Sequence, residues 1–256
     1  MVGDFARAAG YRLIIRDEVG STMEEARRAL HQGDPGLLWI VARSQNAGRG
    51  RHGRHWTSPP GNLYASLLLV NPCEPALAPQ LGFVAGLALH DAVARVTGLT
   101  APRLALKWPN DLLVDGAKCS GLLLEGESGA GRFAVIAGLG VNIASCAQGT
   151  PYPASFLRAH APDVTIEATL AALVEAWLNR FDVWRQPGGF TPTRAAWLER
   201  AAFLGGTITI RLPEGPLEGR FAGIDATGRL ELETLGGRRL VDAGDLFFGN
   251  GQAQAR

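Results

Sequence analysis

The sequence predicts an α+β chain, rich in both helices and strands, whose C-terminal part is a small β-barrel. Before Thr207, β-rich runs alternate with segments whose apolar residues recur at helical spacing. From Thr207 onward the chain consists of short β-rich runs separated by turn residues: TITIRL, LEGRFAGID, RLELETL and RRLVD. Such a series fits a barrel of SH3-like size. We place the boundary near Leu204–Gly206, which divides the chain into residues 1–204 and 205–256.

Turn residues and apolar spacing predict the individual elements. Strands are predicted over Tyr11–Val19, Leu37–Gln45, Asn62–Val70 and Arg132–Ile143. Helices are predicted over Gln80–Thr97, Thr165–Trp184 and Thr193–Phe203. A further helix follows Ser21 or Thr22, either of which can cap it, and it ends near Gly33. Residues 103–127 predict a strand, a turn and then a hairpin around Asp115-Gly116.

Composition and charge narrow the classes of function. The formal net charge is +1, which argues against a generally basic surface for nucleic acid, so any anion site must be local. The N-terminus lacks the features of a signal peptide, and no apolar run approaches the ~18 residues of a membrane helix. The three cysteines are odd in number and form no C-x-x-C motif, which predicts free thiols in a reducing cytoplasm. The five histidines form no cluster with metal-ligand spacing, so we predict no metal site.

Lysine is rare in this chain. Of the 25 basic residues only Lys107 and Lys118 are lysines, and both lie within one twelve-residue stretch. A lysine provides a point charge on a flexible stem, which an arginine does not. The clustering therefore singles out this stretch, although chance clustering is the alternative.

The loop AGRGRHGRHW (Ala47–Trp56) contains the spelling G-x-G-x-x-G. A dinucleotide-binding loop of that spelling opens a helix, because the pyrophosphate sits on the helix N-terminus. Here Pro59-Pro60 follows and prevents a continuing helix. Large cationic side chains such as that of Arg51 would also crowd a close backbone approach. We therefore reject a Rossmann site.

Charge is the more informative property of this loop. No Asp or Glu occurs from Pro35 to Cys73, whereas four arginines do. Concentrated positive charge on a glycine-rich loop suits a phosphate-bearing ligand, and Trp56 offers a ring for stacking. A solvated basic loop and a nucleic-acid-binding arm are the alternatives.

The segment KWPNDLLVDGAKCSG is equally informative. Its Trp-Pro-Asn-Asp sequence predicts a turn at a strand end, which brings Asn110 and Asp111 to a strand terminus. Lys118 then lies on the return strand of the hairpin, and Gly121 permits close backbone approach. Simple turn chemistry for Asn110 and Asp111, and a solvated Lys118, are the alternatives.

These two segments together resemble the biotin protein ligase family, which attaches biotin to carrier domains of carboxylases. The resemblance continues in Ser21-Thr22, in Gln45 and in GLGVN (Gly138–Asn142), and it covers essentially the whole chain. It implies a catalytic domain with a mixed β-sheet packed by helices, similar to class II tRNA synthetase cores, followed by an SH3-like domain. It also implies ATP and biotin as substrates, Mg²⁺ accompanying ATP, and an apo biotin carboxyl carrier protein as partner.

The resemblance implies two half-reactions, in which biotin is first activated as biotinyl-5′-AMP and then transferred to a carrier lysine. The first step needs alignment and charge compensation rather than a base, since a carboxylate is already ionised at pH 7. The implied catalytic residues are Lys118, Arg51 and Asp111. The implied biotin-binding residues are Ser21, Thr22, Met23, Gln45, Gly48, Arg49, Gly50, Arg51, Lys118 and Gly121. The implied ATP- and adenylate-binding residues are Arg51, Arg54, Trp56, Asn110, Lys118 and Asn142.

Some features depart from the family pattern or stay open. Met23 stands where relatives often carry a polar residue, and Lys107 is either a ligand contact or only a neighbour of the core residue Trp108. Twenty residues precede Ser21, which is too few for the N-terminal DNA-binding domain of some relatives, so we expect no DNA binding. The oligomeric state is open, with a homodimer among the alternatives. Lipoate–protein ligase and a non-catalytic RNA-binding module are the competing functions.

Overall fold

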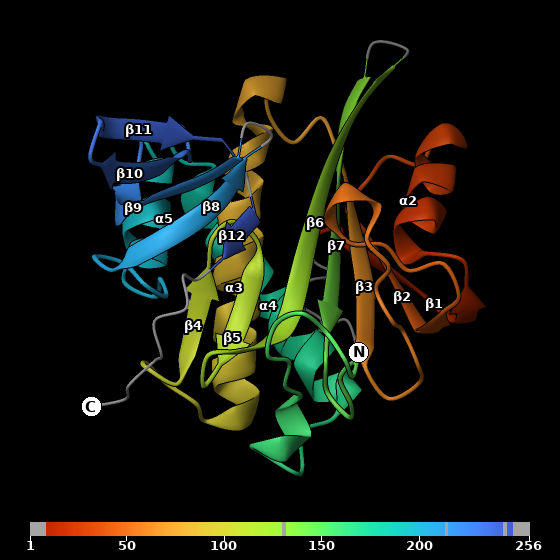
Figure 1. The fold of residues 1–256 in the computed structure, drawn as a ribbon. Coiled ribbons are helices and arrows are strands. Elements are labelled where there is room, and N and C mark those ends of the chain that lie inside the picture. Colours follow the sequence, from red (N-terminus) through yellow and green to blue (C-terminus); the bar gives the residue numbers. More distant parts are fainter. Residues whose placement is uncertain (1–8, 130–131, 213–214, 243–244, 248–256) are drawn as a thin grey trace.

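A seven-stranded mixed sheet forms the centre of the larger part of the molecule (Figure 1). The computed structural model describes residues 9–129, 132–212, 215–242 and 245–247. In sheet order the strands are β1 (Arg12–Val19), β2 (Leu38–Gln45), β3 (Leu63–Val70), β7 (Arg132–Val141), β6 (Ala117–Gly129), β5 (Asp111–Val114) and β4 (Leu104–Lys107). β1 and β2 are parallel, and the other neighbouring strands are antiparallel. The predicted mixed sheet is therefore confirmed.

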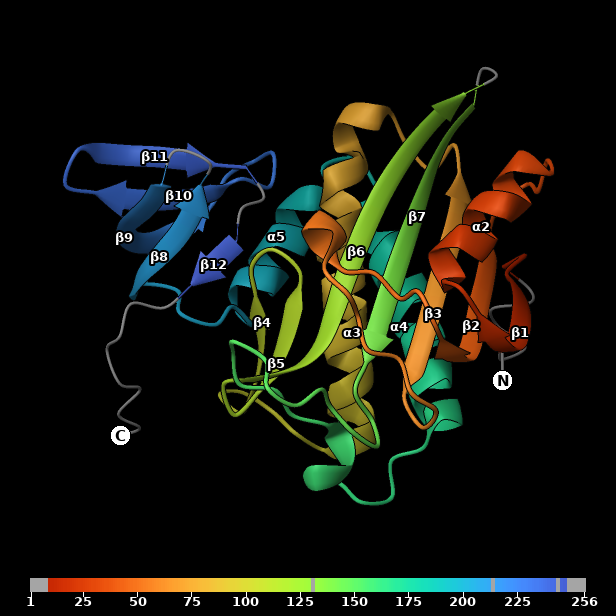
Figure 2. The same ribbon diagram turned by 45° about the vertical axis from the view of Figure 1, so that its right-hand side comes forward.

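The sheet separates two apolar layers, because successive side chains of a strand point to opposite faces. On β2, Trp39 and Val41 belong to the larger core, whereas Leu38 and Ile40 belong to the smaller one. Helices α3 (Leu81–Thr97) and α4 (Ile166–Trp184) cover the larger core, and α2 (Thr22–His31) covers the smaller one (Figure 2). The face that carries α2 also carries the cavity described below.

The N-terminus of α2 is fixed by a side-chain cap. The Ser21 hydroxyl accepts the backbone N–H of Met23 at 3.3 Å, and Ser21 itself is extended, with φ −156° and ψ 138°. Of the two candidate caps, Ser21 is therefore the one used. The hydroxyl of Thr22 is consequently available for another partner.

One expectation from the sequence does not hold for the helical segment Pro75–Thr97, which consists of the 3₁₀ turn η2 (Pro75–Gln80) followed directly by α3. The helix has 23 residues, and an 18-residue stretch of it has a mean hydropathy of 1.3, so by length and composition it could cross a membrane and the expectation that no run approaches this length was wrong. Its apolar residues belong to the core of the fold, because 67% of this 18-residue stretch is buried. It packs against the sheet beside α4 as a core helix (Figure 1).

A second sheet follows helix α5 (Phe190–Leu198). It is antiparallel, in the order β11 (Gly237–Val241), β10 (Leu230–Thr234), β9 (Gly215–Ile224), β8 (Thr207–Leu212) and β12 (Asp245–Phe247). The small β-unit predicted from Thr207 onward is thus present. Its buried residues Ile208 and Phe221 belong to the same core as the large sheet. The exact boundary at residues 204–205 stays a prediction.

Two local predictions had different outcomes. Asp115 and Gly116 both have positive φ, 48° and 79°, as the predicted hairpin turn requires. The last predicted helix is displaced, since it lies over Phe190–Leu198 and not Thr193–Phe203. Backbone pairing explains its early end: Leu106 of β4 donates to the Arg200 carbonyl at 2.7 Å and accepts from Ala202 at 2.7 Å. The chain after α5 therefore runs alongside β4.

Candidate active site

A cavity of about 920 Å³ lies on the α2 side of the large sheet. Its walls come from the start of α2, the loop between β2 and β3, strands β5 and β6, and the segment 151–153. The C-terminal sheet completes the wall with Thr207 and Thr209 of β8 and Glu218 of β9. Segments distant in sequence thus enclose a single space of a size suited to small molecules, about 300–1,000 Å³.

Three glycines on neighbouring strands form the floor of this cavity. Gly138 and Gly140 of β7 point to the same face as Gly121 of β6, which pairs with Gly140. A Cβ atom at Gly138 would lie 2.6 Å from the Met23 sulfur, and one at Gly140 would lie 2.5 Å from the Trp56 indole nitrogen. Since real side chains do not approach so closely, these positions require glycine so that Met23 and Trp56 can lie against the sheet.

Trp56 carries the end of the arginine-rich loop down to this floor. Its ring is 3.0 Å from where a Cβ atom of Gly121 would be, and its buried N–H finds no acceptor among the described residues. The Lys118 ammonium lies 5.4 Å from the centre of this ring and 5.3 Å from that of Tyr152. Both distances are within the range of cation–π attraction, so the two rings favour a cation at this place.

Lys118 is also paired with Asp111 across the β5–β6 hairpin. The Nζ–Oδ1 distance is 2.7 Å, and both side chains are only about one-sixth exposed, at 17% and 16%. The backbone of Lys118 is held by the segment 153–155, whose Pro153 carbonyl accepts its N–H at 2.9 Å. A nearly buried ammonium group with a fixed position therefore faces the cavity. Such a group can compensate negative charge on a bound anion.

A chain of hydroxyl and amide groups lies at the other end of the cavity, with Thr22 and Gln45 on the lining and Ser58 and Ser66 behind them. Ser66 donates to the Thr22 hydroxyl at 2.8 Å, and both the Thr22 hydroxyl and its backbone N–H donate to Gln45 Oε1, at 3.1 and 2.8 Å. Gln45 Nε2 in turn donates to Ser58, which donates to the Trp56 carbonyl. These groups are neutral and include both hydrogen-bond donors and acceptors, as the binding of a neutral polar ligand requires.

The loop between β2 and β3 contains only one short turn, η1 (Arg51–Gly53), and crosses in front of β6 and β7 (Figure 2). Two residues of this turn have positive φ, His52 at 55° and Gly53 at 70°. Gly48 is needed for space, because a Cβ atom there would be 2.6 Å from the Trp56 carbonyl. The structure agrees with the rejection of a Rossmann loop, since no helix of useful length follows the glycines.

Most of the residues proposed from the sequence line this cavity. They are Ser21, Thr22, Met23, Gln45, Arg49, Gly50, Arg51, Arg54, Trp56, Asn110, Asp111, Lys118 and Gly121. Lys107, whose role was open, lies on the lining as well.

Two of the proposed residues lie outside the lining. Gly48 lies close to the Trp56 carbonyl within the loop. Asn142 donates through its amide to the Ser155 carbonyl at 3.1 Å. Asn110 lines the cavity, but its amide donates to the Leu122 carbonyl at 2.5 Å. The proposed adenine contacts of Asn110 and Asn142 therefore stay predictions.

The sequence reasoning missed several lining residues. Tyr152 and the residues of the C-terminal sheet carry no recognisable motif, and only the fold brings them to the cavity. The glycine floor did leave a signal. Gly138 and Gly140 are two apart in a β-rich run, so they share one face of a strand and leave that face without side chains.

The cysteine next to Lys118 in the sequence is not placed to react in the cavity. Cys119 follows Lys118, but it points into the opposite, larger core, and burial raises the pKa of its thiol to about 12. Within the described residues, no group of three or more His, Cys, Asp or Glu side chains is placed to hold a metal ion. The cavity lining presents an ammonium group, guanidinium groups, the Asp111 carboxylate and neutral polar groups.

Comparison with known proteins identifies relatives over nearly the full chain. Residues 19–142 match the model of the biotin/lipoate A/B protein ligase family, and residues 203–249 match the biotin protein ligase C-terminal domain. The biotin–[acetyl-CoA-carboxylase] ligase of Paracoccus denitrificans is 41% identical over 90% of this chain and 97% of its own length. The enzyme of the same name from Mycobacterium tuberculosis is 32% identical over 93% of this chain and 90% of its own.

A solved structure agrees with these sequence matches. The biotin protein ligase of Aquifex aeolicus, in complex with biotin and ATP, is 27% identical and has a TM-score of 0.80. The match covers 93% of this chain and 99% of the Aquifex chain, so it includes both the large sheet and the C-terminal sheet. Sequence, fold and cavity lead to the same conclusion: this chain belongs to the biotin protein ligase family.

Proposed function

We propose that this chain activates biotin with ATP and transfers it to a lysine of an apo biotin carboxyl carrier protein. In the first step an oxygen of the biotin carboxylate attacks the α-phosphorus of ATP, which forms biotinyl-5′-AMP and releases pyrophosphate. In the second step the carrier lysine amine attacks the acyl carbon, the amine loses a proton, and AMP leaves. The Paracoccus relative is named for this ligation to acetyl-CoA carboxylase.

The observation that carries this proposal is the position of Lys118. Its ammonium lies in a cavity that the arginine-rich loop and the KWPND segment line together, between the rings of Trp56 and Tyr152 and beside Asp111. A carboxylate and an α-phosphate repel each other as they approach. A fixed cation between them reduces that repulsion and stabilises the charge of the transition state.

We assign the phosphate chemistry to Lys118 and Arg51. Arg51 lines the same cavity, and its planar guanidinium can bind two phosphate oxygens at once. Asp111 orients Lys118 through the 2.7 Å pair and so organises the reacting centre. Mg²⁺ belongs with the phosphates of ATP in this proposal, since Mg²⁺ commonly binds through substrate phosphates and a few protein oxygens.

We assign biotin's bicyclic ring to the floor and the neutral polar end of the cavity. Its ureido group has two N–H donors and one carbonyl acceptor, which Ser21, Thr22 and Gln45 complement. The backbone of Gly50 and Gly121 leaves room for the apolar part of the molecule. Met23, which fills the depression at Gly138, contributes an apolar surface here.

The nucleotide side is assigned to Arg54, Asn110 and Trp56, with Arg49 bordering the biotin end. Asn142 is kept as an adenine candidate, although its amide already bonds to Ser155. Absence of DNA binding, homodimer formation and a cytoplasmic location are further expectations. Filter binding to promoter DNA and sedimentation analysis would test the first two.

The decisive experiment incubates the protein with ATP, labelled biotin and an apo carrier domain. Label in the carrier that survives denaturation, and that depends on ATP and on the acceptor lysine, is the expected result. ATP–pyrophosphate exchange measured with biotin and with lipoate distinguishes the two ligase activities of the family. Exchange supported by lipoate and not by biotin would overturn the proposal.

A further inference from the structure

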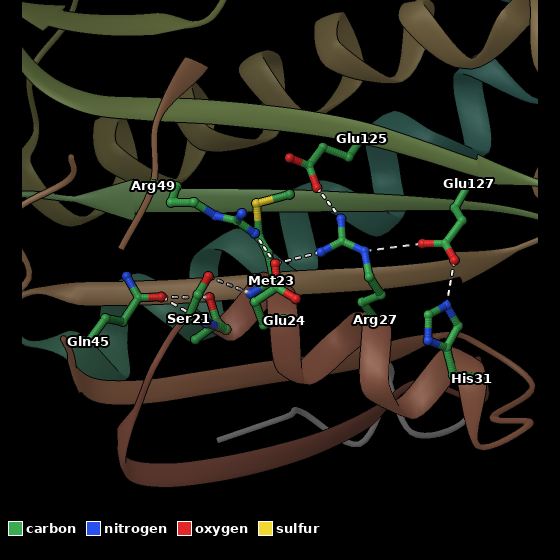
Figure 3. Close-up of polar contacts among 10 residues, drawn as sticks. Ser21, Met23, Glu24, Arg27, His31, Gln45, Arg49, Glu125 and Glu127 are labelled. Carbon is green, nitrogen blue, oxygen red and sulfur yellow. Dashed lines mark hydrogen bonds and ion pairs between the residues drawn. The ribbon is translucent and has the colours of Figure 1, made fainter. Parts of the chain in front are cut away.

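A cluster of charged side chains lies beside the cavity, between α2 and β6 (Figure 3). We call it the rim cluster, and its members are Glu24, Arg27, His31, Arg49, Glu125 and Glu127. The chemistry proposed above uses only Arg49 of these. The other members come from α2 and from the far half of β6, beyond its pairing with β5. Their arrangement calls for a separate explanation.

Arg27 fixes the position of the Glu24 carboxylate. It donates to Glu24 at 2.6 Å, to Glu125 at 2.5 Å and to Glu127 at 3.1 Å, so one guanidinium joins three carboxylates from two elements (Figure 3). The side chain of Arg27 is only 26% exposed. Glu24 is therefore held in place one residue after Met23 and two after Thr22, both of which line the cavity.

Arg27 alone does not neutralise the carboxylates of the rim cluster. Three carboxylates share the single charge of Arg27, which leaves an excess of two negative charges before the remaining members are counted. Arg49 supplies one positive charge through its ion pair with Glu24 (Figure 3). His31, at 2.5 Å from Glu127, adds another when it is protonated. The excess charge attracts Arg49 toward α2 and away from the open solvent.

Arg49 connects this charge to the arginine-rich loop as a unit. Inside the loop, Gly50 donates to the Arg54 carbonyl at 2.7 Å and Trp56 donates to the Gly48 carbonyl at 2.9 Å. Arg49 and His55 form a β-bridge between these bonds. The segment 48–56 is thus a small internally bonded hairpin, and a restraint on Arg49 restrains the whole segment.

We propose that Glu24, positioned by Arg27, is a latch that holds the segment 48–56 over the cavity and thereby slows the escape of the bound adenylate. Glu24 is a positioning residue, because it acts through Arg49 and does not touch the reacting atoms. The effect on the adenylate rests on the proposed function. The restraint of the segment does not, since it follows from contacts within the chain itself.

The test compares Glu24→Gln with Glu25→Gln. Glu25 lies on the same helical turn and pairs with Arg28 at 2.5 Å within the helix, whereas Glu24 pairs with Arg49 of the loop. In the ligand-free protein, Glu24→Gln should accelerate amide hydrogen exchange within residues 48–56, whereas Glu25→Gln should not. Biotinyl-5′-AMP should dissociate about two- to fivefold faster from Glu24→Gln, as expected for a partly exposed ion pair.

Arg49→Gln and the double variant distinguish a latch from a general loss of stability. If Glu24 acts through Arg49, the double variant should match Arg49→Gln, because Glu24→Gln has no interaction left to remove once Arg49 is replaced. Added salt should accelerate adenylate dissociation in the wild type and have less effect in Glu24→Gln.

The outcomes separate this inference from the proposed function. Unchanged exchange in residues 48–56 of Glu24→Gln would overturn the latch, as would fully additive effects of Glu24→Gln and Arg49→Gln. Faster exchange together with a failure of the wild type to bind biotinyl-5′-AMP would support the restraint and contradict the function proposed for the cavity.

Discussion

At the scale of single residues, substitutions can separate the structural role of the Lys118–Asp111 pair from the chemical role that we propose for it. Removing the lysine leaves a nearly buried carboxylate without its cation, which is destabilising. Lys118→Ala should therefore lower both the melting temperature and the rate of adenylation. We expect the rate to fall by about 10²–10³-fold, the scale observed when a single group that stabilises developing charge is removed.

The double variant Lys118→Ala with Asp111→Asn provides the control. It removes the unpaired charge, so its melting temperature should recover while pyrophosphate exchange stays low. Arg43→Ala should leave both unchanged, because Arg43 lies outside the cavity lining in a highly exposed pair with Asp17. Recovery of activity together with stability would show that Lys118 serves only to neutralise Asp111.

The glycine floor makes a second prediction at this scale. In Gly140→Ala the new methyl group would meet the Trp56 ring at about 2.5 Å, so Trp56 must shift into the space that we assign to biotin. Overpacking of this kind costs about 1–3 kcal/mol, and if this cost falls on the bound state the affinity for biotin drops by about five- to 150-fold. Isothermal titration calorimetry would measure it.

Gly82→Ala is the matched substitution for this test. Gly82 has negative φ, lies in α3, and no atom lies within 4 Å of where its Cβ would be. It should bind biotin as the wild type does and gain slightly in stability, since alanine favours helix. Equal affinity of Gly140→Ala and wild type would show that Trp56 does not border the ligand.

Residue identities were predicted well where a motif carried them and poorly where only folding gathers them. Lys118, Asp111 and Gln45 belong to recognisable segments, and all three line the cavity. Tyr152 and Glu218 do not, because their position depends on the pairing of residues 153–155 with β6 and on the packing of β9 against α5. A one-dimensional pattern contains no signal for such contacts.

At the scale of elements, the turn between β9 and β10 should make the protein sensitive to acid. Burial alone would raise the pKa of Asp225, but hydrogen bonds from Arg229 and Thr227 lower it to about 2. Its carboxylate accepts the backbone N–H groups of Thr227 at 2.8 Å and Arg229 at 2.9 Å. The folded-state pKa is thus below the unfolded value near 3.9, so this stabilisation is present above about pH 4 and is lost as the pH falls toward 2.

Asp225→Asn should therefore be less stable than the wild type by about 1–2 kcal/mol at pH 7, and the difference should shrink at pH 2.5. Urea unfolding at both pH values would measure this. Asp17→Asn provides the comparison, because the Asp17 side chain is 94% exposed and should show no such difference. A gap for Asp225→Asn that is independent of pH would contradict the assignment.

Elements were predicted best where local signals fix both ends. Strand β1 and helix α2 lie within a residue or two of their predicted bounds, since Ser21 caps the helix and Gly33 has a φ of 88°. Helix α5 was misplaced because nothing local ends it. It ends where Arg200 and Ala202 bond to β4, which is a partner almost one hundred residues earlier.

At the scale of the whole molecule, the two sheets should unfold together. Trp197 of α5 contacts Phe83 of α3, with ring centres 5.5 Å apart, and both share one core with Ile208 of the C-terminal sheet. Arg194 of α5 donates to the Ile224 carbonyl of β9 at 2.8 Å. We expect a single calorimetric transition with equal calorimetric and van't Hoff enthalpies. A separate transition for residues 205–256 would contradict this.

Two glycines of the small sheet test the same coupling. Gly228 and Gly237 both have positive φ, 98° and 101°, so alanine is strained at either. At Gly228 the new Cβ would also lie 2.9 Å from the Phe83 ring, whereas at Gly237 nothing lies within 4 Å. Gly228→Ala should melt lower than Gly237→Ala by about 2–4 °C for each extra kcal/mol, still in one transition. Equal melting temperatures would mean that the contact with α3 contributes nothing.

The order of strands in the large sheet lay beyond the sequence patterns, although a mixed sheet was implied by the family resemblance. β3 pairs with β7, about seventy residues away, and the apolar alternation of each strand is compatible with many neighbours. Only the combined packing of α2 on one face and α3 with α4 on the other selects one order.

The glycine floor on β6 and β7 also determines how easily a substitution can change the shape of this cavity. At Gly138 the depth of the cavity depends on one side chain, because the Met23 thioether fills the space above this glycine. Met23→Ala would open a blind recess beneath the ligand while leaving the backbone intact. The variant should then bind a biotin analogue with one extra small substituent, which the natural protein does not bind. Such an analogue would be attached to carrier domains by the variant alone.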